Sequence, residues 1–265
     1  MSKVHIFIDG SWFFHVCAPN ADGVLARKLA EPRSFRLDFN KLKSTILEHI
    51  QSQRSDCTEI GDCFNVTSIF SFPDDYDSWV GQCVDGHEIT QADIQKPKNN
   101  VRNRTAFVTR SFQAGFKEES VIRPQITQRK LLRYINKQYR EKEVDSTVVA
   151  LIVKYAITKH NDYFAVIAGD ADIMPALMIT CPDYTKNICL VTSHPNELEQ
   201  RHQLTAQKYL DFNFEIDPLF LQNQVNKIIE GDYVYRCNCC QRLYVQSTPT
   251  STRQMPYCEI CKPTA

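Results

Sequence analysis

Two short apolar runs that end in aspartate beside glycine constrain the fold of this chain more than any other feature of its sequence. The first is HIFIDG at residues 5–10, and the second is YFAVIAGDAD at residues 163–172. Runs of this kind are typical of strands buried on both faces of a parallel sheet. Because ligands bind at the carboxyl ends of strands in open α/β sheets, Asp9, Asp170 and Asp172 are expected to gather at one edge. Carboxylates crowded in this way repel one another and are commonly stabilised by a divalent cation.

The rest of the first 215 residues alternates expected strands with expected helices. Strands are expected at residues 4–8, 64–72, 106–112, 162–168 and 187–192, and helices at 38–53, 73–83 and 145–159; residues 131–135 fit either. A polar stretch that contains Pro97, residues 85–103, is expected to be an exposed loop. This alternation predicts an α/β fold with a mostly parallel sheet and helices on both faces.

Composition excludes few functions. The 31 basic and 31 acidic residues cancel, so net charge neither supports nor opposes a nucleic-acid partner. The apolar run at the N-terminus is too short for a signal peptide, and no apolar segment approaches the roughly 18 residues needed to span a bilayer. Eleven cysteines in such a chain are expected to be reduced thiols or metal ligands. We therefore expect a cytoplasmic protein with no membrane partner.

The last part of the chain is expected to be a small zinc-binding module. A connecting helix is predicted over residues 216–230, and residues 231–265 are rich in cysteine. Two CxxC pairs, separated by 17 residues, are formed by Cys237 and Cys240 and by Cys258 and Cys261. Paired CxxC motifs at this spacing predict a tetrahedral structural zinc site, and the metal would supply much of the folding energy of so small a module. Cys239 is an alternative to Cys240, although the spacing favours Cys240.

Three motifs resemble those of the NYN domain, the LabA-like branch of the PIN-type nuclease fold. They are IDG at residues 8–10, EVD at 143–145 and AVIAGDADIMPAL at 165–177. The resemblance covers roughly residues 1–215, including LTAQKYLDF at 204–212, and implies a three-layer domain with a mostly parallel central sheet. The activity that it implies is metal-dependent hydrolysis of phosphodiester bonds, with RNA expected over DNA.

The resemblance implies catalytic roles for four aspartates, namely Asp9, Asp145, Asp170 and Asp172. The first three are expected to hold Mg²⁺ or Mn²⁺, which would activate a water molecule for attack on phosphorus. Asp172 is expected to be a further ligand, the N-cap of the next helix, or both, because Pro175 is tolerated in a first helical turn. The chain departs from the family pattern in two places. The family usually has an asparagine soon after the first aspartate, where this chain has Ser11 and Trp12, and Leu151 stands where a second helix aspartate is often found.

Basic residues suggest where a nucleic acid would bind, and they leave alternatives open. Arg102, Arg104 and Arg110 could line a substrate groove beside the acidic residues, or they could belong to an ordinary solvated segment. The zinc module could bind RNA, bind a protein partner, form a homo-oligomer or only cap the main domain. A metal-dependent nuclease is the leading hypothesis. The alternatives are a catalytically weak nucleic-acid-binding or regulatory protein and a phosphatase-like hydrolase.

Overall fold

A six-stranded sheet forms the centre of the molecule in the computed structural model, which describes residues 2–20, 23–83, 90–136, 143–169, 171–193, 214–249 and 256–262. The strands are β1 (Ser2–Asp9), β2 (Cys57–Ser68), β3 (Val121–Ile122), β4 (Tyr163–Ile167), β5 (Ile188–Thr192) and β6 (Leu219–Phe220). Their order is β3-β2-β1-β4-β5-β6, and all neighbouring strands are parallel. The prediction of an α/β fold with a mostly parallel central sheet is confirmed.

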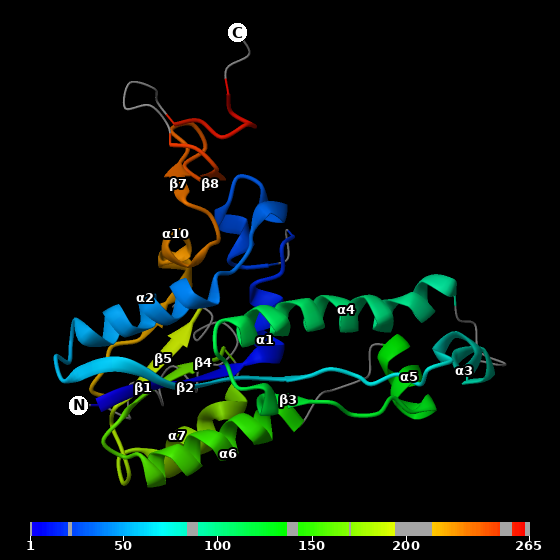
Figure 1. Cartoon of the computed structure of the whole chain (residues 1–265), viewed down its shortest axis with the longest axis horizontal. Coiled ribbons are helices and arrows are strands. Elements are labelled where there is room, and N and C mark those ends of the chain that lie inside the picture. The colour runs from blue at the N-terminus through cyan, green and yellow to red at the C-terminus, as the bar shows by residue number, and fades with distance from the viewer. Residues whose placement is uncertain are drawn as a thin grey trace.

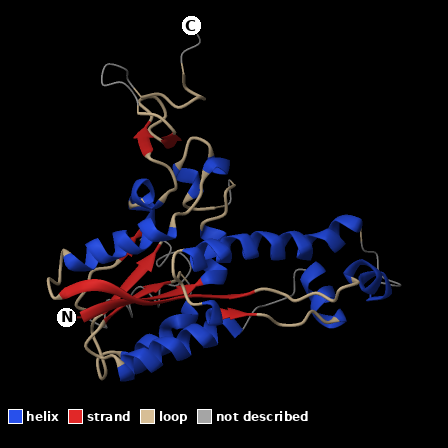
Figure 2. Cartoon of the chain, in the orientation of Figure 1, coloured by secondary structure: helices blue, strands red, loops and turns tan. Residues whose placement is uncertain are grey.

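Helices cover both faces of this sheet (Figures 1 and 2). One face packs against α1 (Gly10–Val16), α2 (Phe39–Gln51), the end of α4 (Gln91–Gln113) and α10 (Val225–Ile228). The other face packs against α6 (Glu143–Thr158) and α7 (Met174–Thr180). Each face of the sheet has its own hydrophobic core, the first against α1, α2, α4 and α10 and the second against α6 and α7. β1 contributes to both, because Ile6 and Ile8 are buried in the first core and Phe7 is buried in the second. The main domain therefore has three layers.

Several helices and strands lie where the sequence predicts them. Asp38 caps α2, and its Oδ1 accepts hydrogen bonds from the backbone N–H groups of Asn40 at 2.9 Å and Lys41 at 3.0 Å. The helix predicted over residues 145–159 is α6, and the short helix predicted over 73–83 is α3 (Tyr76–Cys83). Most cysteines outside the two CxxC pairs are buried, among them Cys57, Cys63, Cys83, Cys181 and Cys189.

The middle of the chain differs from the prediction. The described part of the expected loop at residues 85–103 and the expected strand at 106–112 together form the single helix α4, which extends away from the sheet toward α3 and α5 (Gln128–Ile135) (Figure 1). Its start is fixed by a capping box, in which the Thr90 hydroxyl accepts from the Asp93 N–H at 3.2 Å and Asp93 accepts from the Thr90 N–H at 3.3 Å. An interior proline costs a helix about 3 kcal/mol. Here Pro97 is buried, and the cap together with packing outweighs that cost.

The segment after Phe214 also differs from the prediction. Instead of one connecting helix over residues 216–230, the chain forms β6, a 3-10 turn at Leu221–Asn223 and the four-residue helix α10. β6 extends the sheet by pairing with β5, and Val225 and Ile228 of α10 are buried in the first core. These residues thus complete the main domain. No helix in the described part of the chain is long and apolar enough to cross a membrane.

A polar network closes the amino end of the sheet. His5 is only 2% exposed, and its Nε2 lies 3.0 Å from Asp162 Oδ2. Its Nδ1 accepts a hydrogen bond from the backbone N–H of Asp62 at 2.9 Å, so Nε2 carries the proton and donates to Asp162. The Asp62 carboxylate accepts a hydrogen bond from Tyr155 Oη at 2.8 Å and pairs with Lys117 Nζ at 3.1 Å. Both ring nitrogens of the buried His5 of β1 therefore have hydrogen-bond partners.

Asp62→Asn is expected to reduce the loss of stability in acid. Partial burial raises the pKa of Asp62, but hydrogen bonds from Tyr155 and Lys117 outweigh burial and hold this pKa below its usual value of 3.8. A carboxylate with a depressed pKa contributes stability above about pH 4, and that contribution is lost as the pH falls through the folded-state pKa. Urea unfolding between pH 7 and pH 2 should therefore show a flatter acid limb for Asp62→Asn than for an Asp183→Asn control. Identical profiles for the two variants would contradict this assignment.

Candidate functional site

The strand order reverses between β1 and β4, and the two acidic motifs end at this point. β1 continues through β2 to one side, and β4 continues through β5 to the other. Ile8 is paired with Ile167, so Asp9 at the end of β1 lies next to the end of β4, where Gly169 follows. In doubly wound sheets, ligands bind in the crevice outside the carboxyl ends of the strands at such a reversal. The topology therefore brings Asp9 and Gly169 to the edge where a ligand is expected.

Asp9 has a structural role at this edge as well. Its side chain is nearly buried, with 3% of the residue exposed, and its Oδ1 accepts hydrogen bonds from the N–H groups of Ser11 at 3.1 Å and Trp12 at 3.0 Å. Asp9 is thus the N-cap of α1. Only glycine fits next, because a Cβ at Gly10 would lie 2.4 Å from Asn65 Oδ1. The start of α1 is therefore locked against β2, with the Asp9 carboxylate fixed at the strand end.

The other three predicted aspartates are placed differently. Asp145 is half-buried in the first turn of α6, which runs back along the sheet so that its start lies at the same carboxyl edge (Figure 1). α6 contacts the 3-10 turn Ala171–Ile173, in which Asp172 is exposed. Asp170 lies outside the described residues. The role of Asp172 as N-cap of α7 is wrong, because the 3-10 turn moves the cap position to Ile173, which makes no side-chain cap.

The described carboxylates do not by themselves form a metal site. Among the described residues, the four cysteines of the C-terminal module are the one group of three or more cysteine, histidine or acidic residues whose ligand atoms all lie within 4.8 Å of one another. Asp9, Asp145 and Asp172 are therefore not gathered that closely. A magnesium or manganese site at this edge depends on Asp170, and the predicted ligand set stays a prediction.

Trp12 covers the glycine that precedes Asp170. A Cβ added to Gly169 would lie 2.4 Å from Cε2 and 2.5 Å from Nε1 of the Trp12 indole, closer than side chains approach. α1 therefore packs through Trp12 directly onto the end of β4.

Gly169→Ala is expected to destabilise the domain by about 1–3 kcal/mol, because the added methyl group must displace the indole from a packed position. A matched control is Gly81→Ala in α3, where an added Cβ meets nothing within 4 Å. This control should raise stability by about 0.5–1 kcal/mol, since alanine favours a helix over glycine. Urea unfolding followed by circular dichroism measures both changes. Equal stability of Gly169→Ala and the wild-type protein would show that Trp12 does not restrict this position.

One of the three predicted substrate-binding arginines reaches the acidic edge, the carboxyl edge of the sheet at which Asp9 and the start of α6 lie. Arg104 Nη1 donates to Ser11 Oγ at 3.3 Å and to the carbonyl oxygen of Ser68, the last residue of β2, at 3.0 Å. Its guanidinium also lies 5.6 Å from the ring centre of Phe14. A positive charge from α4 is thus fixed close to the helix that Asp9 caps.

The other two predicted arginines lie on α4 before and after Arg104. Arg102 is exposed. Arg110 Nη1 lies 3.6 Å from Glu230 Oε1, and its guanidinium lies 5.9 Å from the ring centre of Phe107. Arg110 lines a pocket of about 850 Å³ together with aromatic and amide side chains, among them Phe14, Phe35, Phe107, Asn103 and Gln113. Phe14 lines this pocket and also contacts Arg104, so the pocket lies next to that arginine.

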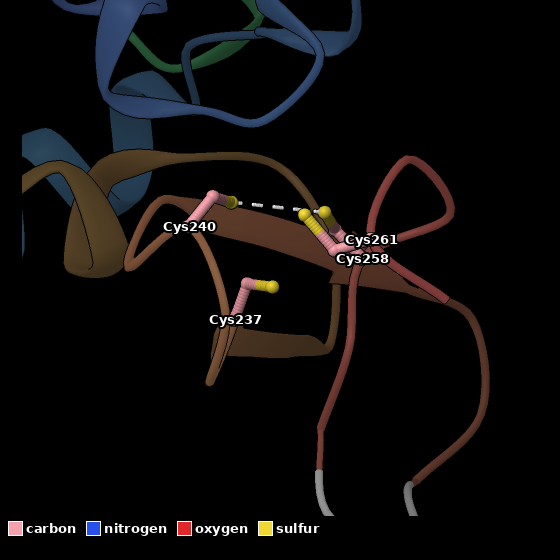
Figure 3. Close-up of side chains that lie close together, drawn as sticks. All are labelled: Cys237, Cys240, Cys258 and Cys261. Atoms are coloured by element: carbon pink, nitrogen blue, oxygen red, sulfur yellow. Dashed lines mark hydrogen bonds between the residues drawn. The ribbon is translucent and has the colours of Figure 1, made fainter. Parts of the chain in front are cut away.

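The C-terminal module brings four thiols together (Figure 3). The Sγ atoms of Cys237, Cys240, Cys258 and Cys261 all lie within 4.8 Å of one another, and those of Cys240 and Cys258 are 3.8 Å apart. A tetrahedral zinc ion with Zn–S bonds of about 2.3 Å would hold its sulfurs about 3.8 Å apart. The group therefore fits a structural metal such as zinc. Cys239 is not part of it, in agreement with the predicted spacing.

The local fold explains why these thiols meet. β7 (Tyr233–Arg236) and β8 (Leu243–Gln246) form an antiparallel hairpin. Its turn is closed by the Cys237 N–H, which donates to the Arg242 carbonyl at 2.9 Å. The Asn238 N–H donates to the Pro256 carbonyl at 3.0 Å and thereby joins the second CxxC pair to the first. Burial opposes ionisation, but hydrogen bonds from the backbone of neighbouring cysteines lower the pKa of Cys237 to about 6, which favours the thiolate that binds metal.

The module is attached to the main domain by backbone pairing. The Ala30 N–H donates to the Leu243 carbonyl at 2.7 Å, and Leu29 forms a parallel bridge with Leu243. Ala30 is buried among Cys237, Cys258 and the aromatic residues of the module. Residues 29–30 and the hairpin therefore form one packed unit.

The resemblance to the NYN domain rests on three sequence motifs. In comparison with known proteins, no family model, curated protein or solved structure matches this chain.

Proposed function

We propose that this protein is a metal-dependent nuclease that hydrolyses phosphodiester bonds, with RNA as the preferred substrate, a PIN-like NYN domain as its body and a zinc ribbon at its C-terminus. One observation carries the proposal: Asp9 and Gly169, which leads into Asp170, lie at the carboxyl ends of adjacent strands where the strand order reverses. Asp145 lies at the same edge. Such an edge suits a hard cation with oxygen ligands.

Each group at the edge then has a role. Asp9, Asp145 and Asp170 would hold Mg²⁺ or Mn²⁺, which when bound supplies an activated water and offsets negative charge on the reacting phosphate. Arg104, fixed by Ser11 and Ser68, would bind a non-reacting phosphate oxygen and orient the strand. The pocket of about 850 Å³ that Phe14 lines has the mixture of aromatic and amide side chains that suits a stacked base. The zinc ion would have a structural role only.

A second candidate function is a nucleic-acid-binding or regulatory protein with weak catalysis. Leu151, which stands where the family often has an aspartate, packs against the second core. Asp172 is exposed in its 3-10 turn. The site would then have fewer carboxylates than the family pattern implies, and its cation would be held less tightly.

Cysteine usage supports a cytoplasmic location. None of the eleven cysteines, all of which lie in the described part of the chain, forms a disulfide, and the six outside the four-thiol group and Cys239 are buried. Burial raises the pKa of several of these thiols, Cys63 to about 12. Thiols of this kind are stable in a reducing compartment.

The test is a cleavage assay with end-labelled single-stranded RNA and DNA. The wild-type protein and Asp170→Asn are incubated with Mg²⁺, Mn²⁺ or EDTA, and Mg²⁺ or Zn²⁺ is added back after chelation. We expect RNA cleavage in Mg²⁺ or Mn²⁺, restored by Mg²⁺ and not by Zn²⁺, and lost in Asp170→Asn. Binding without cleavage would favour the regulatory function, and cleavage that survives in Asp170→Asn would refute the proposed site.

A further inference from the structure

We infer that a cationic pocket between the cysteine module and the main domain binds consecutive phosphates of a single-stranded polynucleotide. The pocket has a volume of about 380 Å³ and is formed by three separate segments, residues 27–28, 222–226 and 236–243. Its basic residues are Arg27, Lys28, Arg236 and Arg242. The inference rests on the proposed function only in naming a nucleic acid as the ligand, since the pocket lies on the module and not at the acidic edge.

The charge of this pocket is all of one sign. The described residues that line it include four basic side chains and no acidic one, although acidic and basic residues are equally numerous in the whole chain. All four basic side chains are exposed. Four amide side chains also line the pocket: Gln222, Asn223, Asn226 and Gln241. Arginine, lysine and amide side chains are the groups that contact phosphate and sugar oxygens in nucleic-acid complexes.

The fold holds this pocket in shape. The hydrogen bond from Ala30 to Leu243 places Arg27 and Lys28, which lie in the preceding turn, beside the hairpin. Arg236 Nη1 donates to the Gln241 carbonyl at 2.7 Å, which orders the turn between the two strands. Cys240, a member of the four-thiol group, lies in this turn and also lines the pocket. Metal binding and phosphate binding therefore share one structural element.

A polynucleotide backbone fits better than a single small anion. Each phosphodiester carries one negative charge, so four cations match several successive phosphates. No aromatic side chain is among the described residues that line this pocket, so the pocket itself offers no stacking surface for a base. Binding should therefore depend on the backbone and show little preference for base sequence.

The test measures binding of a fluorescein-labelled single-stranded RNA by anisotropy at 50–200 mM KCl. All proteins are full-length, zinc-loaded and carry Asp170→Asn to prevent cleavage. Arg27→Gln with Lys28→Gln should raise the Kd about tenfold or more at 50 mM KCl and reduce the salt slope by about 1.4, since each single-strand phosphate contact contributes about 0.7. The control with the same charge change combines Lys154→Gln on α6 with Lys159→Gln just after this helix, and it should stay within about twofold of its parent.

Two further measurements complete the test: RNA binding by Arg242→Gln, and binding of tripolyphosphate by every variant. Arg242→Gln should weaken RNA binding in the same direction from the other side of the pocket, and zinc content should stay unchanged in every variant. Equal affinity and equal salt slope for the pocket variant and the control would overturn the inference. So would loss of tripolyphosphate binding without loss of RNA binding, because the ligand would then be a free polyphosphate. If RNA binding depends on the pocket while the protein with Asp170 intact cleaves no RNA in Mg²⁺ or Mn²⁺, the proposed nuclease is refuted and this inference stands.

Discussion

Asp9→Asn is expected to lower the rate of Mg²⁺-dependent RNA cleavage by at least about a hundredfold, because the carboxylate charge that would hold the cation is lost. The fold should survive the change. Asp9 caps α1 through Oδ1, which accepts from the N–H groups of Ser11 and Trp12, and an asparagine oxygen accepts the same hydrogen bonds. The free energy of unfolding should therefore stay within about 0.5 kcal/mol of the wild-type value, whereas Asp9→Ala should lower it by about 1 kcal/mol.

Asp38→Asn is the matched control for this variant. Asp38 caps α2 by the same pair of backbone hydrogen bonds, but it lies beside Ile228, to whose carbonyl its N–H donates at 2.9 Å. This control should retain wild-type cleavage and stability. Single-turnover cleavage rates and urea unfolding curves give the two readouts. Normal cleavage by Asp9→Asn would remove Asp9 from the metal site and leave it only a helix cap.

Cys258→Ser is expected to abolish zinc binding, from about one ion per chain to nearly none. A structural zinc ion bound by cysteine contributes on the order of 10–16 kcal/mol in small zinc modules, and most of this is folding energy. The hairpin β7–β8 should then lose protection from amide hydrogen exchange. The Ala30 amide should lose protection too, because its partner is the carbonyl of Leu243 in β8.

Cys239→Ser is the control for the zinc experiment. Cys239 is exposed and lies next to Cys240, yet it is not part of the four-thiol group. It should therefore keep its zinc and its hydrogen-exchange protection. Elemental analysis after purification in metal-free buffer, followed by exchange mass spectrometry, separates the two variants. Full zinc content in Cys258→Ser, or loss of zinc in Cys239→Ser, would show that the ligand set is assigned wrongly.

The strands that could be predicted from the sequence are those buried on both faces. β1, β4 and β5 are continuous apolar runs, and all three lie at or near the positions expected for them. β3 and β6 have only two residues each, which is too short for any periodicity to show, and they exist because longer strands offer them an edge. The helix α4 was missed for a different reason. Only its last turns pack on the main core, through Phe107, and Pro97 is an argument against a helix when sequence alone is considered.

The positions of the candidate site residues could be predicted from the sequence only where they follow from the end of a strand or the start of a helix. The end of β1 fixes Asp9, and the start of α6 fixes Asp145 near the same edge. The place of Arg104 beside Ser11 depends on the direction of α4, and this direction could not be predicted from the sequence pattern. The cationic pocket could not be predicted at all, because Arg27 and the hairpin are more than 200 residues apart and meet through a backbone bridge at Leu29.

The position of β6 determines where a protein fragment that contains only the main domain must end. A fragment that ends at residue 215, the boundary expected from sequence, would lack β6 and α10 and leave the edge of β5 unpaired, which invites aggregation. It would also lose buried apolar residues of the first core: Leu219, Leu221, Val225, Ile228 and Ile229. Each contributes about 1.5–3 kcal/mol when fully buried. The smallest unit able to fold alone therefore extends through about residue 230, so the autonomous domain is longer than the segment that carries the three motifs.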